Sequence, residues 1–301
     1  MTDSPAMRYI LDPSTPLGEE IRRIAFEKLD GIASDLAETG PGRAAAVHTA
    51  RKRIKKLRGV LRLIRQGDLG FYKQGNRALR DLARAIASER AAGARLNTFR
   101  ALPADLVLDL PVTLAMLEEA FDAEHERSLS SSPDIAAALE RTARLRADFV
   151  AFSLPDKSGP VKLLRQGVRA SRKVASDQFR ALGKRPSAGT LHEWRKSVKY
   201  HWMHTQLLRD ALPYGKPYRA ALKALADLLG EHNDLADLES WLRDTASVRL
   251  PVGERDRLLP VLVERRAELE TLARDRGKAV LVIEKPGLGA AIRAAFKSRG
   301  T

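Results

Sequence analysis

The stretch Val47–Arg65 constrains the fold of this chain more than any other. It contains eight Lys and Arg residues and no acid. Its cationic residues recur at steps of three and four, the spacing of side chains on one face of an α-helix, and its apolar residues follow the same steps one position earlier. The cationic set is His48, Arg51, Lys55, Arg58, Arg62 and Arg65, and the apolar set is Val47, Ala50, Ile54, Leu57, Leu61 and Ile64. The stretch predicts a helix of roughly 28 Å that buries one stripe and holds a ladder of positive charge beside it.

A second version of this stretch, residues 191–212, lies 144 positions further along the chain. The matching pairs are His48 with His192, Arg51 with Arg195, Lys52 with Lys196, and Lys55 with Lys199. Apolar residues keep a helical period on both sides of each version, and no convincing strand is found. The expected helices are 17–38, 47–65, 72–100, 112–128 and 134–153, then 161–182, 191–212, 216–246, 256–276 and 288–298. We therefore expect an all-α fold in which an internal repeat of roughly 145 residues forms two antiparallel helical bundles.

The segment LPDKSGP, residues 154–160, is the best candidate for a boundary between the halves, because the helical pattern starts again after it. This predicts a lead segment over residues 1–16, a first bundle over 17–154 and a second bundle over 155–301. The run AVLVIE, residues 279–284, resembles a strand, but Pro286 and Gly287 follow it closely. We expect an extended or helix-ending segment there.

The charge of the chain indicates an anionic partner. There are 53 Lys and Arg against 38 Asp and Glu, a formal charge of +15, and such an excess is typical of proteins that bind nucleic acid, a membrane surface or another polyanion. Residues 101–148 hold ten acids and four bases, whereas residues 159–223 hold fifteen bases and three acids. Because a uniformly solvated surface would mix the signs, we expect one basic face or channel where the halves meet.

Several classes of protein are excluded or disfavoured. The chain has no cysteine, which excludes disulfide bonds, thiolate metal sites and a cysteine nucleophile. No apolar run has the length of a signal peptide at the start or of a transmembrane helix elsewhere, so we expect a cytoplasmic protein without a membrane span. The phosphate-loop, dinucleotide-binding and nucleophile-elbow motifs do not occur.

The two cationic ladders have the chemistry of a phosphate site. Guanidinium groups bind phosphate oxygens in pairs, ammonium groups act as point charges, and histidine can donate a hydrogen bond. A solvated helix face is the alternative, but the same register occurs twice with a histidine at the same place, which favours a site. The helix before the second stretch carries a further cationic row at Lys162, Arg165, Arg169 and Arg172.

The second stretch differs from the first in its aromatic residues. Tyr200 and Trp202 stand where the first stretch has Lys56 and Arg58. The rings could stack on nucleic-acid bases, as in single-strand binders. The alternative is that aromatic residues at helical spacing fill the core, and we favour it because Trp194 lies in the apolar register.

Metal binding is only weakly indicated. The second stretch has three histidines but no H-E-x-x-H pattern, and His201 lies in the apolar register, where we expect it to be buried and hydrogen-bonded. The densest polar cluster of the chain is Glu231, His232, Asn233, Asp234 and Asp237. It could hold a divalent ion or pair with basic residues, and we prefer pairing because the corresponding stretch of the first half, 88–91, lacks most of these groups. No metal site, cofactor or catalytic residue is predicted.

With the pattern H-x-x-R-x-x-x-[KR]-[KR]-x-R near the start of the second helix of each half, the chain resembles the CHAD family, the conserved histidine α-helical domain. The first stretch is similar at His48, Arg51, Lys55, Lys56, Arg58 and Arg62. The second matches at His192, Arg195 and Lys199 and then departs from the pattern at Tyr200 and Trp202. Residues 9–25, 225–242 and 282–296 are also similar. The resemblance implies two four-helix bundles related by a pseudo-two-fold axis, with a basic groove or pore between them.

The resemblance also implies a function. Members of the family bind inorganic polyphosphate and localise to polyphosphate granules, and some are fused to a CYTH triphosphatase domain, whose E-x-E-x-K signature is missing here. A stand-alone, non-catalytic binding module is therefore expected. The residues expected to contact polyphosphate are His48, Arg51, Lys52, Lys55, Lys56, Arg58 and Arg62, then Lys162, Arg165, Arg169, Arg172 and Lys173, and finally His192, Arg195, Lys196 and Lys199.

Two other functions stay open from the sequence. A nucleic-acid-binding protein would use the same basic face together with Tyr200 and Trp202. A phosphohydrolase, or an accessory module of one, would need a metal or a nucleophile among the cations, and the acid-rich segments lie away from the basic stretches in the sequence.

Overall fold

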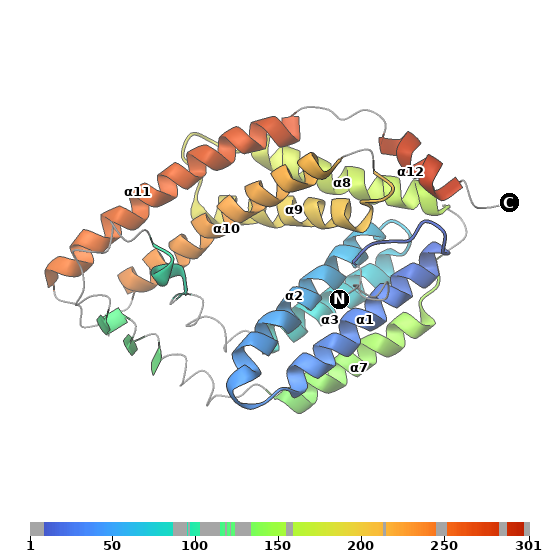
Figure 1. Cartoon of the computed structure of the whole chain (residues 1–301), viewed down its shortest axis with the longest axis horizontal. Coiled ribbons are helices and arrows are strands. Elements are labelled where there is room, and N and C mark those ends of the chain that lie inside the picture. Colours follow the sequence, from blue (N-terminus) through green and yellow to red (C-terminus); the bar gives the residue numbers. More distant parts are fainter. Residues whose placement is uncertain are drawn as a thin grey trace.

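A computed structural model describes residues 9–86, 95, 97–102, 115–117, 119–120, 122–123, 134–154, 159–212, 215–244, 252–282 and 288–297. Within these ranges the chain is predominantly helical and contains no strand, so the all-α prediction is confirmed (Figure 1). The helices are α1 (Leu17–Ala37), α2 (Arg43–Leu63), α3 (Leu69–Ala85), α7 (Ile135–Ala151), α8 (Pro160–Arg180), α9 (Ala188–Leu207), α10 (Lys216–Asp244), α11 (Val252–Gly277) and α12 (Leu288–Lys297). A short 3₁₀ turn, Gly40–Gly42, joins α1 to α2.

One predicted helix differs in its bounds from the structure. The helix expected over 72–100 begins earlier, because Asp68 caps it by accepting a hydrogen bond from the Phe71 N–H, and α3 ends at Ala85. Most of the helix expected over 112–128 lies outside the described residues. The strand-like run after residue 278 forms a π-helical turn, Lys278–Val282, that continues α11, in agreement with a helix-ending segment.

The helices form two groups (Figure 1). In the first, α1 packs against α2 and α7, and α3 packs against the same two helices. In the second, α8, α9, α10 and α11 pack in that order, with α12 and the π-helical turn on α8. The predicted apolar stripe of α2 is buried in the first group at every position: Val47, Ala50, Ile54, Leu57, Leu61 and Ile64. Its burial confirms the helical register that was read from the sequence.

The two groups meet where α2 packs against α8 and α9. We call this contact the seam. Glycine makes this approach close on both helices of the contact. A Cβ added to Gly59 of α2 would lie 3.2 Å from Sδ of Met203, and one added to Gly167 of α8 would lie 2.0 Å from the carbonyl oxygen of Leu63. The seam between the groups therefore brings backbones together, not just side chains.

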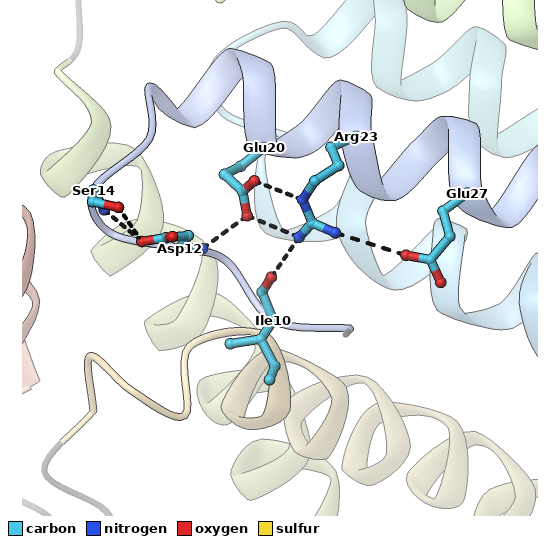
Figure 2. A network of polar contacts seen from close by, with 6 residues as sticks. All are labelled: Ile10, Asp12, Ser14, Glu20, Arg23 and Glu27. Atoms are coloured by element: carbon cyan, nitrogen blue, oxygen red, sulfur yellow. Dashed lines mark hydrogen bonds and ion pairs between the residues drawn. The ribbon is translucent and has the colours of Figure 1, made fainter. Parts of the chain in front are cut away.

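The lead segment before α1 contacts both groups, and Figure 2 shows the contacts that hold it against α1. Leu11 is buried, and its N–H donates to the carbonyl of Leu207 at the end of α9, at 2.8 Å. Arg23 of α1 donates to both carboxylate oxygens of Glu20, at 2.6 and 2.8 Å, and to the carbonyl of Ile10. The same carboxylate accepts the N–H of Asp12. This network holds the segment across the seam.

A second, smaller core lies at the far end of α10 and α11. Phe99, Leu102 and Leu117 pack there with leucines of these two helices. Arg95 forms an ion pair with Asp237 of α10 at 3.3 Å. Residues that belong by sequence to the first half thus cover the end of the second group.

Candidate anion-binding site

The cationic ladder of α2 is held in place by α3. Nη1 of Arg51 donates to the carbonyl of Ala83 at 2.7 Å, and Nε of Arg58 donates to Oδ1 of Asn76 at 2.9 Å. Because a guanidinium group has five N–H donors in one plane, a single contact of this kind orients the others. The two arginines are therefore oriented along the edge of the first core, where the sequence predicts them.

Lys56 lies on the side of α2 that faces the lead segment. Its Nζ is 5.4 Å from the centre of the Tyr9 ring, and the Tyr9 hydroxyl donates to the Lys56 carbonyl at 2.8 Å. Burial lowers the pKa of Lys56, and the nearby charges of Lys28 and Arg53 lower it further. The charge of Glu27 opposes this effect, and Lys28 and Arg53 are paired with Glu27 and Asp35 at 2.5 and 2.8 Å.

Two cations of the seam cover aromatic rings of α9. The guanidinium carbon of Arg62 is 4.2 Å from the centre of the Tyr200 ring, and Nζ of Lys199 is 4.4 Å from the centre of the Trp202 ring. Cation–π contacts of this kind contribute roughly 0.5–1 kcal/mol or more when partly desolvated. Each ring therefore has one face occupied by a cation of the site.

The ladders of α2 and α9 converge. Burial is the main cause that lowers the pKa of Lys199, Asp227 opposes it, and the charges of Arg195, Lys223 and Lys52 lower the pKa further. Lys52 belongs to α2, so its charge reaches across the seam. Arg62 of the first stretch lies over the Tyr200 ring of the second, so at this point the structure brings the two stretches together.

Arg62 and Arg195 each have an Nε atom that is buried and has no hydrogen-bond partner among the described residues. Arg195 packs beside Gly230 of α10, where an added Cβ would lie 3.4 Å from Nε. An unsatisfied buried N–H costs about 1–3 kcal/mol. A ligand oxygen that reached these groups after a small side-chain rotation would remove this cost.

His192 is oriented by α10. Its Nδ1 makes a short hydrogen bond to Oδ1 of Asn233, while Nδ2 of Asn233 donates to Asp234 at 3.4 Å. The second contact assigns the oxygen of the Asn233 amide to the His192 side, so Nδ1 carries the proton and Nε2 faces away from Asn233. His48, at the matching position of α2, is half-buried.

The remaining predicted residues of α2 and α9 are less enclosed. Lys52 is exposed and Lys55 is half-buried. Lys196 is exposed and forms an ion pair with Glu193 at 2.7 Å. These side chains are positioned at the solvent edge of the seam, where a long anion could reach them.

The cationic row of α8 is placed elsewhere. α8 contacts α2 through Gly167, and at 100° per residue the row lies on a different side of the helix. Nη2 of Arg172 donates to the carbonyl of Leu281 at 3.4 Å, and Lys173 forms an ion pair with Asp177 at 2.6 Å. The other members, Lys162, Arg165 and Arg169, are exposed or half-buried. The structure therefore does not join this row to the α2 ladder.

The polar cluster of α10 pairs with basic residues. Glu231 accepts hydrogen bonds from Arg265 of α11, at 2.8 and 3.1 Å, and Asn233 contacts His192. His232 is buried, and burial lowers its pKa to about 4, with the charge of Arg266 acting in the same direction. Among the described residues, no three His, Asp or Glu side chains are grouped as a metal site would require. These contacts agree with the pairing interpretation.

His201 and Trp194 are core residues, as the sequence predicts. Both are fully buried. Nδ1 of His201 contacts the Ser171 hydroxyl at 3.1 Å and its Nε2 contacts the Tyr218 hydroxyl at 3.0 Å. Burial lowers the pKa of His201 to about 3.

A set of cations that was not predicted from the sequence lies between α9 and α10. These cations line an open groove of about 510 Å³ beside Trp202. The cations are Arg209, Lys216, Arg219 and Lys223. Lys216, Arg219 and Lys223 are spaced by three and four residues, so the sequence already indicated that they share a helix face. Unlike the two predicted ladders, this set does not include a histidine.

In the parts of the chain that the structure describes, no helix has the length and apolar character that crossing a lipid bilayer requires. The fold defines an all-helical protein whose two helix groups meet where α2 packs against α8 and α9.

A family model described as the CHAD domain matches residues 24–243, well over half of the chain, and the chain belongs to the CHAD domain family. Among solved structures, it is similar to the CHAD domain from the plant Ricinus communis, with 18% identity, a TM-score of 0.59 and 98% of each chain covered. It is also similar to PptA from Streptomyces chartreusis, with 18% identity, a TM-score of 0.62, and 87% of this chain and 96% of that chain covered. At this identity the likeness shows the fold. No curated protein sequence matches the chain.

Proposed function

We propose that this protein binds inorganic polyphosphate, without catalysis, along the seam between the two helix groups. The observation that carries the proposal is that α2 packs against α9, with the guanidinium carbon of Arg62 from the first ladder 4.2 Å from the centre of the Tyr200 ring of α9. Polyphosphate is a linear chain of negative charges without bases, and it requires closely spaced cations with little stacking. We further propose that the protein acts in the cytoplasm at polyphosphate granules.

The aromatic residues favour polyphosphate over nucleic acid. A base-stacking site needs an open ring face. Tyr200 and Trp202 are half-buried, and each already has a cation of the seam over one face. In this arrangement the rings position Arg62 and Lys199 for a phosphate ligand.

The carboxylates support a binding role. The candidates for a catalytic or metal-holding set, Glu231 and Asp237, are engaged by Arg265 and Arg95. Glu239 is likewise engaged by Arg243 and Arg266. The proposal therefore assigns them to the packing of α10. Incubation with polyphosphate and Mg²⁺ or Mn²⁺ should release no phosphate, and measurable turnover would contradict this assignment.

The test of the proposal is a competition experiment. Long-chain polyphosphate, RNA and DNA compete for the protein across a range of salt concentrations. Polyphosphate should displace both nucleic acids at about physiological salt, with an affinity that falls steeply as salt rises because each phosphate contact releases counterions. If RNA of equal charge binds as tightly or more tightly, polyphosphate is not the preferred ligand.

A pair of variants separates the two ligands further. Trp202→Ala should weaken RNA binding by roughly 1–3 kcal/mol if bases stack on this ring. Under the proposal it has a small effect, while Arg51→Gln combined with Lys55→Gln causes a large loss of polyphosphate affinity. The opposite ranking would favour the nucleic-acid function.

A further inference from the structure

The cationic face of α9 continues past the seam into the groove between α9 and the start of α10. Arg195, Lys199, Trp202, Gln206 and Arg209 follow each other at steps of three and four, so they share one face of α9 and of the turn that ends it. The groove begins at Trp202 and is lined on the opposite side by Lys216, Arg219, Ala220 and Lys223 of α10. It is open to solvent and has a volume of about 510 Å³.

The groove carries a strong positive charge. Four of its eight lining residues are cations and one, Asp210, is an acid. Asp210 forms an ion pair with Arg209 at 3.3 Å, and Asp227, just outside the groove, forms one with Lys223 at 2.6 Å. Exposed pairs of this kind contribute little, so a phosphate chain can replace the carboxylates at low cost.

The groove is continuous with the seam. Nζ of Lys199 lies 4.4 Å from the centre of the Trp202 ring, and Trp202 lines the groove. The charges of Lys223 from the groove and of Lys52 from α2 both act on Lys199. Trp202 thus links the two sites, because its ring carries Lys199 and lines the groove together with Lys223 of α10.

The cations of the groove also compensate for charges that the second stretch lacks. At the positions where α2 and the turn after it carry Arg58, Arg62 and Arg65, the chain 144 residues later has Trp202, Gln206 and Arg209. Two of the three charges are thus missing from the second stretch. Three cations at helical spacing, Lys216, Arg219 and Lys223, face the same positions from α10.

We propose that this groove is a second section of the polyanion site, which takes the phosphates of a long chain beyond those held at the seam. The inference rests on the proposed function and adds a chain-length preference to it. Short polyphosphates occupy the seam, and long ones occupy both sections. The first turn of α10, which begins at Lys216 and contains no acid, adds the positive end of a 29-residue helix to the groove.

The test compares two triple variants of the full chain. The groove variant carries Lys216→Gln, Arg219→Gln and Lys223→Gln. The control variant loses the same charge at exposed cations of α7 and α11: Arg141→Gln, Arg144→Gln and Arg276→Gln. Each is titrated with tripolyphosphate and with long-chain polyphosphate at several salt concentrations, and circular dichroism with thermal unfolding verifies that the fold is retained.

The groove variant should bind long chains roughly 10- to 100-fold more weakly than the wild type, from three exposed charge contacts. Its slope of log affinity against log salt should fall by about two. Tripolyphosphate affinity should be unchanged, and the control variant should keep the long-chain affinity. A second groove variant, Lys216→Arg with Lys223→Arg, retains the charges and should bind long chains like the wild type.

Each other outcome has a distinct meaning. If the groove variant binds long chains as the wild type does, the groove is not part of the site, while the proposed function stands. If it loses both ligands equally, or if the control loses long chains to the same extent, the effect is one of overall charge or fold and the inference fails. If the wild type binds neither polyphosphate, the proposed function fails and the groove section fails with it.

Discussion

Met203 of α9 packs against Gly59 of α2 where the two helices cross, and the two positions are separated by the same 144 residues as His48 and His192. The Gly59 carbonyl accepts a 3.0 Å hydrogen bond from Nε2 of His204, one residue further along α9. Because the crossing occurs at matching points of two similar helices, corresponding parts of their cationic ladders approach each other. The geometry of the crossing therefore determines whether the ladders form one site.

We predict that Gly167→Ala disrupts this seam. The new Cβ would lie 2.0 Å from the carbonyl oxygen of Leu63, and a backbone atom can yield only if α2 shifts. Overpacking of this kind should lower the free energy of unfolding by about 3 kcal/mol, as measured by denaturant titration. Gly18→Ala in α1 is the control, because its nearest neighbour would be Nη1 of Arg22 at 3.9 Å. Equal stability of the two variants would show that α8 and α2 are not in backbone contact.

The sequence predicted the helices and their buried faces because these depend on local periodicity. Every apolar residue of the α2 stripe is buried, and Trp194 and His201 are in the core as expected. A spacing of three and four residues identifies the side chains that share one face of a helix. The apolar face is then buried because of the hydrophobic effect.

The partners of the cationic faces could not be predicted in the same way. The rows of α8 and α9 have the same spacing, yet Arg172 contacts the carbonyl of Leu281 while Lys199 faces the seam. The difference depends on which side of α8 carries Gly167, a contact between residues about a hundred positions apart. Similarly, Lys216 and Lys223 join the site because α10 packs beside Trp202.

Acid should destabilise the protein through three buried histidines. Burial is the main cause that lowers the pKa of His201 to about 3 and the pKa values of His204 and His232 to about 4. In the unfolded chain a histidine titrates near ~6.5, so between about pH 6.5 and 4 the unfolded state binds more protons and stability falls as pH decreases. Each group contributes about 1.4 kcal/mol per pH unit in this window. Denaturant titrations at a series of pH values measure the slope.

The variant His201→Asn provides the check on this slope. It removes one titrating group, so the fall in stability with acid should become shallower by about 1.4 kcal/mol per pH unit. His192→Ala is the matched control, since this histidine is half-buried, whereas His201 is fully buried. The interpretation fails if the stability of His201→Asn falls with decreasing pH as steeply as that of the wild type and of His192→Ala.

Asn233 should affect polyphosphate binding through His192. Its Oδ1 fixes the orientation and the proton position of the His192 ring, so Asn233→Ala should weaken binding by roughly 0.5–1.5 kcal/mol, the worth of a hydrogen bond that orients a ligand-binding group. The double variant with His192→Ala should bind like His192→Ala alone, because the effect requires the imidazole. Additive losses would indicate that Asn233 acts through the packing of α10 instead.

The two ladders should contribute unequally. α2 and the turn after it carry Arg51, Lys55, Arg58, Arg62 and Arg65, whereas the second stretch loses charge after Lys199. Arg51→Gln with Lys55→Gln should therefore weaken polyphosphate binding more than Arg195→Gln with Lys199→Gln. The first pair lies in the denser ladder, so it should also lower the slope of log affinity against log salt by up to about two, and the second pair by less. Titrations of both double variants at several salt concentrations, with unfolding midpoints as a control for folding, measure the difference. Equal losses would mean that the α10 cations fully replace the charges that the second ladder lacks.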